Sequence, residues 1–147
     1  EARSRIDRGP TDPAETNRLQ RLAAETGTVP AVNQLELHPY FQQTELRAYH
    51  RDHGIATEAW SPIGQGGDLL QDERLAELAE KYGKTPAQIV LRWHVQVGNI
   101  VFPKSVTADR VRENADIFDV ELADDDLATV ATLERGERMG PNPDDFG

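Results

Sequence analysis

A short basic and hydroxyl-bearing stretch in the last third of the chain carries the residue types of an anion site. Residues 100–102, just before it, are β-branched or aromatic and are flanked by a glycine and a proline, which predicts a short buried strand. Lys104 and Ser105 would then lie at the carboxyl end of that strand, and Thr107 would cap the following helix. Lys104, Ser105, Arg110 and the free N–H groups of the first helical turn could therefore converge on one phosphate.

An alternative interpretation of this stretch is a strand followed by an ordinary capped helix with solvated charges. The composition makes the basic pair more informative, because the chain of 147 residues has a formal net charge of -10. That charge opposes binding to nucleic acid or to an anionic membrane surface, so a phosphate would have to be held locally by Lys104 and Arg110.

The composition otherwise predicts one globular domain with a real core, since 37% of the residues are hydrophobic. No apolar run approaches the roughly 20 residues of a membrane span. The sequence has no cysteine, which excludes disulfides and thiolate metal sites. No signal peptide is apparent, and we expect a cytoplasmic protein. The four histidines are interpreted as surface helix residues, and no metal site is predicted.

Hydrophobic periodicity and capping signals predict helices that alternate with three strands. This order favours parallel strands joined by crossover helices. Residues 1–17 are interpreted as an irregular arm and residues 135–147 as a Gly-, Pro- and acid-rich tail on either side of the folded part, 18–134. The strands are expected at 31–37, 55–59 and 100–102, and the helices at 19–26, 44–53, 73–82, 86–97, 108–118 and after Asp124.

Each expected strand ends near a polar or aromatic side chain: Gln34, Trp60 with Ser61, and Lys104. Ligands of α/β proteins bind at the carboxyl ends of strands, so these residues belong together. A glutamine amide matches the nicotinamide carboxamide, a tryptophan face can stack on its ring, and the loop 64–67 can approach a pyrophosphate. Taken singly, each has a plainer explanation as a strand-end polar residue, a core aromatic or a flexible loop.

These motifs together resemble the C-terminal half of an aldo-keto reductase, in particular the bacterial 2,5-diketo-gluconate reductase-like members. The resemblance covers the chain from about Leu19 onward. It implies part of a (β/α)8 TIM barrel that reduces aldehydes and ketones to alcohols with NADPH. The matching residues are Pro30-Ala31-Val32-Asn33-Gln34 with His38-Pro39, Ala59-Trp60-Ser61-Pro62-Ile63-Gly64, Thr85-Pro86-Ala87-Gln88 with Leu91-Arg92-Trp93, Phe102-Pro103-Lys104-Ser105, and Arg110 with Glu113-Asn114.

The resemblance also implies which residues would hold the cofactor. Gln34 would hold the nicotinamide carboxamide, and Trp60 would stack on the ring, where many members have Tyr. The remaining implied residues are Ser61, Ile63 and Gln65 at the pyrophosphate, Lys104, Ser105, Val106, Thr107 and Arg110 around the 2′-phosphate and ribose, and Glu113 and Asn114 at the adenine.

The sequence also departs from the family. A (β/α)8 barrel takes roughly 250 residues and eight strands, and only three strands are expected here. The family's catalytic Asp, Tyr, Lys and His match nothing in this chain, so we assign no catalytic residue and predict that the chain alone does not reduce carbonyl substrates. A small carbonyl compound would be its substrate if the barrel is completed. Alternatives are a nucleotide-binding module without chemistry, or an inactive truncated remnant that self-associates through exposed strand edges.

Overall fold

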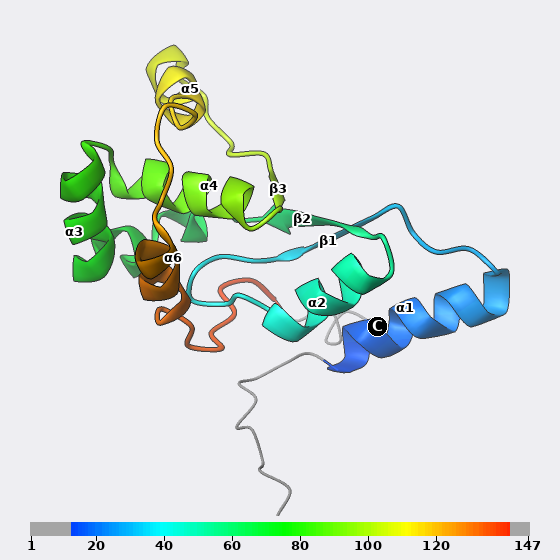
Figure 1. The fold of residues 1–147 in the computed structure, drawn as a ribbon. Coiled ribbons are helices and arrows are strands. Elements are labelled where there is room, and N and C mark those ends of the chain that lie inside the picture. Colours follow the sequence, from blue (N-terminus) through cyan, green and yellow to red (C-terminus); the bar gives the residue numbers. More distant parts are fainter. Residues whose placement is uncertain (1–12, 142–147) are drawn as a thin grey trace, which may run out of the picture.

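A three-stranded parallel sheet organises the computed structural model, which describes residues 13–141 (Figure 1). Its strands are β1 (Val32–Glu36), β2 (Ala56–Trp60) and β3 (Ile100–Val101), in the order β1-β2-β3. Val32 faces Ala56 and Glu36 faces Trp60 in the β1–β2 register, while β3 pairs with β2 over two residues only. The predicted parallel arrangement is confirmed.

Six α-helices within the described residues alternate with these strands. Figure 1 shows α2 next to α1 and α4 running close to β3. No helix in residues 13–141 is long and apolar enough to cross a bilayer. The helices are α1 (Pro13–Thr26), α2 (Thr44–Asp52), α3 (Glu73–Tyr82), α4 (Pro86–Gln96), α5 (Ala108–Ala115) and α6 (Asp124–Ala131), with short 3-10 turns η1 (Gly64–Gly66) and η2 (Asp68–Gln71).

Local sequence signals explain where α3 and α4 begin and end. The Asp72 carboxylate accepts a hydrogen bond from the Arg74 backbone N–H, which caps α3, and Gly83 ends the helix in the left-handed conformation, at φ 63°. Thr85 and Gln88 form the predicted capping box at the start of α4. These short-range predictions are confirmed.

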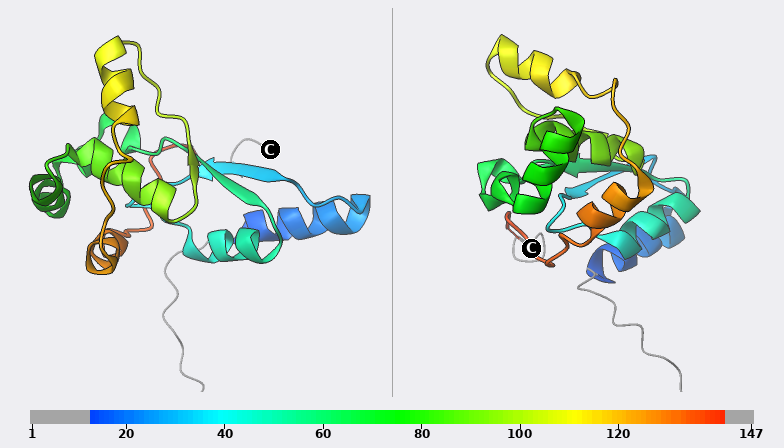
Figure 2. Two further views of the ribbon diagram at one scale, coloured as in Figure 1. Left: turned by 45° about the horizontal axis from the view of Figure 1, so that its top comes forward. Right: turned by 60° about the vertical axis from the view of Figure 1, so that its left-hand side comes forward.

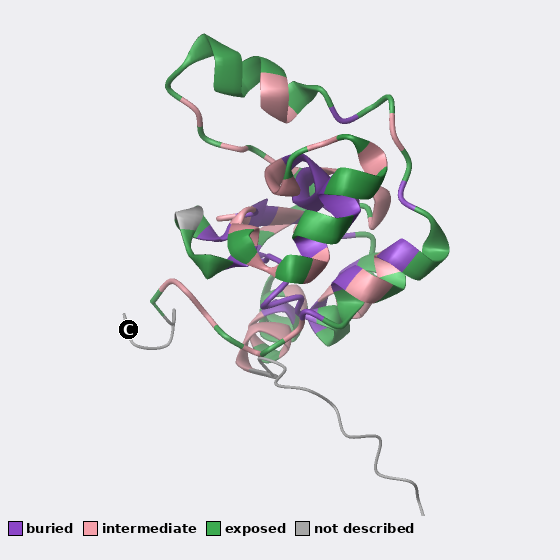
Figure 3. Cartoon of the chain, turned by 90° about the vertical axis from the view of Figure 1, so that its left-hand side faces the viewer, coloured by how far each residue is buried: buried purple, intermediate pink, exposed green. Residues whose placement is uncertain are grey.

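The core lies between the sheet and the helices and consists mainly of leucine, isoleucine and valine side chains. Leu37, Leu75, Ile89 and Val90 are completely buried, and the large Trp93 ring is almost so. α5 takes no part in this core, because none of its residues is buried. Figure 2 shows that α5 projects beyond the other helices, of which α4 is its neighbour, and Figure 3 shows that most of its residues are exposed.

The prediction that the third strand is buried is wrong. Ile100 is 38% exposed and Phe102 is 70% exposed. β3 pairs with β2 on one side, and within the described residues no strand covers its other side. The following helix is also shorter than predicted: it ends at Ala115, and Phe118 is 71% exposed.

The prediction of an irregular arm is wrong for residues 13–17, which form the first turns of α1. Pro13 occupies the first helical position, where a missing N–H costs nothing. The remainder of that arm, residues 1–12, lies outside the described residues.

Three of the four histidines are buried, which corrects their interpretation as surface residues. His38, His50 and His94 are all 0% exposed. The imidazole of His50 is bonded to Thr57 and Asn33, and that of His94 to the Pro62 carbonyl and Asn99. They are structural, and the described residues contain no group of three potential metal ligands.

Candidate functional site

The residues predicted to bind the cofactor fall into two groups at the same edge of the sheet. β2 and β3 are parallel neighbours, so the segments that follow them leave the sheet on the same side. The first group is Gln34, Trp60, Ser61, Ile63 and Gln65, and the second is Lys104, Ser105, Val106, Thr107, Arg110, Glu113 and Asn114.

In the first group, Gln34 and Trp60 lie on β1 and β2 and both have accessible surface. The side-chain N–H of Gln34 donates to the carboxylate of Glu58, its neighbour across the two strands. The carbonyl oxygen of the same amide is left as an acceptor for a ligand N–H. Trp60 is the last residue of β2 and is partly exposed.

The loop after Trp60 has a backbone conformation that its residue types do not favour. Ser61 and Gln65 have left-handed φ angles of 52° and 51°. Such residues cost of order 1–3 kcal/mol and gather at functional sites. The Gln65 amide donates to the Ser61 hydroxyl over 2.8 Å, which closes the loop on itself. The structure therefore brings Ser61 and Gln65 together.

In the second group, Lys104 and Arg110 are exposed and form no ion pair with any described residue. Thr107 occupies the N-cap position of α5, but its side chain makes no capping hydrogen bond, so that part of the prediction is wrong. The N–H groups of the first turn of α5 thus remain without a side-chain cap and point out at the helix start. Two free cations beside an uncapped helix N-terminus favour an anion.

Hydrogen bonds fix the orientation of three more residues of this group. Asn114 donates to the Ser105 hydroxyl over 2.9 Å, which ties α5 to the segment before it. The Glu113 carboxylate accepts a hydrogen bond from Thr85 over 2.9 Å. Val106 is 87% exposed. No hydrogen bond or ion pair joins the first group to the second within residues 13–141.

An apolar groove of about 460 Å³ lies between α4, β3 and α5, and of the predicted site residues only Asn114 lines it. A small cavity of about 60 Å³ is closer to the first group, because Gln34 and Trp60 line it together with Glu36, Gln43 and Arg138. Enclosed volume is therefore a poor guide here, and the exposed polar groups define the candidate site.

Sequence reasoning missed a buried carboxylate beside this cavity. Glu36 has a fully buried side chain and accepts hydrogen bonds from His38 Nε2 and from the backbone N–H groups of Met139 and Gly140. Burial is the main cause that lowers the pKa of His38, although Glu36 opposes it. The sequence signal that could have indicated this buried carboxylate is the position of a charged residue between Leu35 and Leu37.

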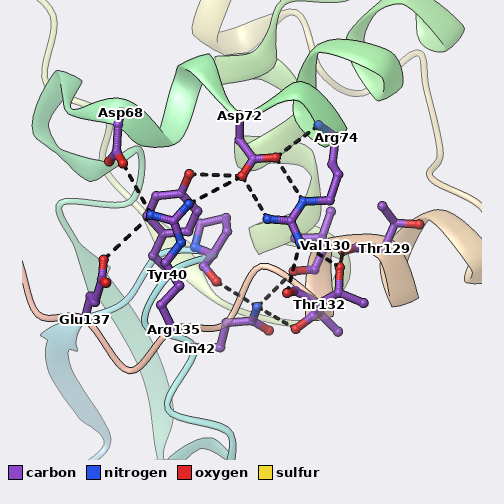
Figure 4. Close-up of polar contacts among 12 residues, drawn as sticks. Tyr40, Gln42, Asp68, Asp72, Arg74, Thr129, Val130, Thr132, Arg135 and Glu137 are labelled. Carbon is purple, nitrogen blue, oxygen red and sulfur yellow. Dashed lines mark hydrogen bonds and ion pairs between the residues drawn. The ribbon is translucent and has the colours of Figure 1, made fainter.

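A second missed cluster surrounds Tyr40 (Figure 4). Its hydroxyl donates to Asp72 over 3.1 Å, and the Arg135 guanidinium lies 3.6 Å from the centre of its ring. Burial, reinforced by Asp72, raises the pKa of Tyr40 to about 12. The Tyr40 hydroxyl therefore makes a structural contact with Asp72.

Parallel strands with crossover helices, and polar residues at the carboxyl ends of the strands, place the chain among the α/β folds, which include the β/α barrels. Residues 12–135 match the sequence model of the Aldo/keto reductase family. The chain belongs to that family, which confirms the resemblance seen in its motifs.

Individual relatives agree with this assignment. The chain is 55% identical over 132 residues to an aldo-keto reductase of Mycolicibacterium smegmatis, covering 90% of this chain and 48% of that protein. It is 52% identical over 134 residues to methylglyoxal reductase DkgA of Escherichia coli, covering 90% and 49%. The chain therefore spans about half the length of these relatives.

Solved structures show the same fold. Gox0644 without ligand superposes with a TM-score of 0.84 at 49% identity, over 87% of this chain and 47% of that one. A Gox0644 mutant solved in complex with NADPH has the same TM-score at 48% identity, over 88% and 48%.

Proposed function

We propose that this chain supplies the NADPH-binding half of an oxidoreductase that reduces small aldehydes and ketones to alcohols. The observation that carries the proposal is the pair of exposed cations, Lys104 and Arg110, beside the uncapped start of α5. A phosphate monoester fits this arrangement of charge and N–H donors. NADPH carries such a group on its adenosine ribose, and NADH does not. The complex of the similar Gox0644 with NADPH supports the choice.

The first group of residues fits the other end of the cofactor. The free carbonyl oxygen of Gln34 would accept from the carboxamide N–H, and Trp60 would stack on the nicotinamide ring. The loop of Ser61, Ile63 and Gln65 would lie along the pyrophosphate. When bound, the cofactor would supply the hydride, and these residues would orient its ring.

That the chain alone is inactive remains a prediction. Tyr40 is not placed as a general acid, because its hydroxyl is bonded to Asp72 and its pKa is raised to about 12. A general acid contributes roughly 10²–10⁴-fold to such a step. We therefore expect binding of the cofactor without reduction of a simple aldehyde, until the rest of a barrel is supplied. The cytoplasmic location also stays a prediction.

A comparison of two arginine variants tests the cofactor assignment. Arg110→Ala removes a free cation, whereas Arg112→Ala removes an arginine of the same helix that pairs with Asp109 over 2.9 Å. Both change the net charge equally. Charge-assisted hydrogen bonds contribute roughly 1.5–3 kcal/mol each, so Arg110→Ala should weaken NADPH binding by about ten- to a hundredfold and NADH binding little. Arg112→Ala should change neither much.

Fluorescence titration of the purified chain with each cofactor at low salt gives the result. Equal affinity of the unaltered chain for NADPH and NADH would refute the assignment, as would an equal loss for both cofactors in Arg110→Ala. Added salt should reduce the preference, because exposed charges are screened.

A second candidate function, self-association, is favoured by the edges of the sheet. Val32 on β1 and Ile100 on β3 are 45% and 38% exposed, and each lies on an edge strand of the described sheet. Unpaired edges with apolar residues promote pairing between chains. Sedimentation over a concentration series tests this, and a monomer at all concentrations would exclude it.

A further inference from the structure

The segment Arg138–Gly140 meets the tip of the Trp60 indole. A Cβ atom added to Gly140 would lie 2.1 Å from Cη2 of that ring and 3.0 Å from both Cζ2 and Cζ3. Real Cβ atoms essentially never show a contact of 2.1 Å, so any larger residue at this position would force the Trp60 ring or the segment to shift. The exclusion is purely steric, because Gly140 is not among the residues with left-handed φ angles.

The direction of this contact follows from the three distances. Cζ2 and Cζ3 are equally far from the added atom, and Cη2 between them is much closer. An atom placed directly above Cη2 would lie nearer to the two neighbours than this. Gly140 therefore approaches in the plane of the ring, from its outer edge, and leaves both faces of Trp60 clear of this residue.

A buried carboxylate holds the segment in this position. Glu36 accepts hydrogen bonds from the backbone N–H of Met139 and, at 3.1 and 3.2 Å, from that of Gly140. The guanidinium of Arg138 is 3.8 Å from the same carboxylate. Glu36 and Trp60 are cross-strand partners on β1 and β2, so the anchor and the ring that the segment meets are direct neighbours.

We propose that Glu36 and Gly140 are positioning residues for Trp60. Glu36 fastens the segment Arg138–Gly140, and Gly140 is a stop against the outer edge of the indole. The stop holds the ring in one plane, and Gly140 itself covers neither face, as a stacking group requires. Only the consequence for nicotinamide stacking rests on the proposed function.

Two substitutions disturb this arrangement of Glu36, Gly140 and Trp60 at different points. Gly140→Ala places a methyl group where the indole tip lies, so the ring must turn or the segment must detach. Glu36→Gln removes the charge and one of the two acceptor oxygens that hold the segment. Pro141→Ala is the matched control, because Pro141 is the next residue, is exposed and makes no hydrogen bond or ion pair with described residues.

Acrylamide quenching of tryptophan fluorescence is the readout without any ligand. Trp93 is 2% exposed, so quenching reports mainly on Trp60. Gly140→Ala and Glu36→Gln should both raise the quenching constant, and Pro141→Ala should leave it unchanged. An unchanged constant in Gly140→Ala would overturn the proposal, whether or not the chain binds NADPH.

A titration with NADPH then tests the link to stacking. Aromatic stacking contributes roughly 0.5–1.5 kcal/mol, so Gly140→Ala should weaken NADPH binding about two- to twelvefold. In a Trp60→Phe background, which lacks the outer indole ring, the same substitution should have little effect. An equal loss in both backgrounds would overturn the positioning role. If the unaltered chain binds no NADPH, the proposed function fails, and the quenching result alone decides the present inference.

Discussion

The side chain of Gln88 should control how firmly α5 is attached. Its amide donates to the carbonyl oxygens of Glu113 and Asp116, at 2.9 and 3.0 Å, and accepts from the Thr85 N–H at 2.9 Å. α5 contributes no buried residue to the core, so few apolar contacts compensate if these bonds are lost. One side chain of α4 thus fixes the carboxyl end of α5, the helix that carries Arg110.

Gln88→Ala removes all three hydrogen bonds. Each contributes roughly 0.5–1.5 kcal/mol net, so the free energy of unfolding should fall by about 1.5–4.5 kcal/mol. Urea unfolding followed by circular dichroism measures this loss. Hydrogen exchange should also show faster exchange of the α5 amides than of the α4 amides, because the attachment of α5 is what the change weakens.

Gln20→Ala is the control for this experiment. Gln20 lies exposed in α1, and its side chain makes no hydrogen bond with described residues. It should change the stability by less than about 0.5 kcal/mol, as surface substitutions usually do. A loss in Gln88→Ala no larger than that in Gln20→Ala, with unaltered exchange in α5, would refute the reasoning.

Two further predictions concern pH. Burial lowers the pKa of His94 to about 3, whereas an unfolded histidine titrates near 6.5. Below about pH 6.5 the unfolded chain therefore takes up a proton that the folded chain does not. The free energy of unfolding should fall from there towards pH 3, by up to about 1.4 kcal/mol per pH unit for this group. His94→Gln should flatten that slope in urea unfolding at stepped pH, and an unchanged slope would contradict it. Asp126 is bonded to Lys81 and Tyr82, which lower its pKa, so the stability it contributes is present above its unfolded pKa and is lost as the pH falls through the lowered value. Asp126→Asn should therefore lower the melting temperature at neutral pH and much less at about pH 2.5, and an equal decrease at both would exclude this ion pair as the cause.

Features that depend on neighbouring residues could be predicted from the sequence. The Thr85 capping box and the Gly83 helix end are read within a few residues, and both are confirmed. The burial of residues 100–102 could not be read in this way, because it depends on which elements lie over β3. The start of α1 was misjudged because residues 1–17 show no regular hydrophobic period, although a proline is well suited to the first turn of a helix.

The same distinction between neighbouring and distant residues applies to the candidate site. Lys104 and Arg110 could be proposed together because they are close in sequence: Lys104 follows β3, and Arg110 lies in the first turn of α5. Glu36 was missed because its partners, Met139 and Gly140, lie more than a hundred residues further along the chain. The buried His50 was missed for a related reason: Thr57 and Asn33, which satisfy its ring, belong to two different strands.

The hydrogen bonds of the residues after α6 have a practical consequence for the design of shortened proteins. Glu134 accepts from the backbone N–H of Gln42 at 2.6 Å, and the N–H of Arg135 donates to the carbonyl of Tyr40 at 3.0 Å. A stop codon placed where α6 ends would remove these hydrogen-bond partners of Gln42 and Tyr40, together with the partners of Glu36 in residues 138–140. Buried polar groups would then be left without hydrogen bonds. Such a product should be degraded or insoluble although every helix and strand of residues 13–141 is retained, whereas an affinity tag joined beyond Gly140 leaves these bonds intact.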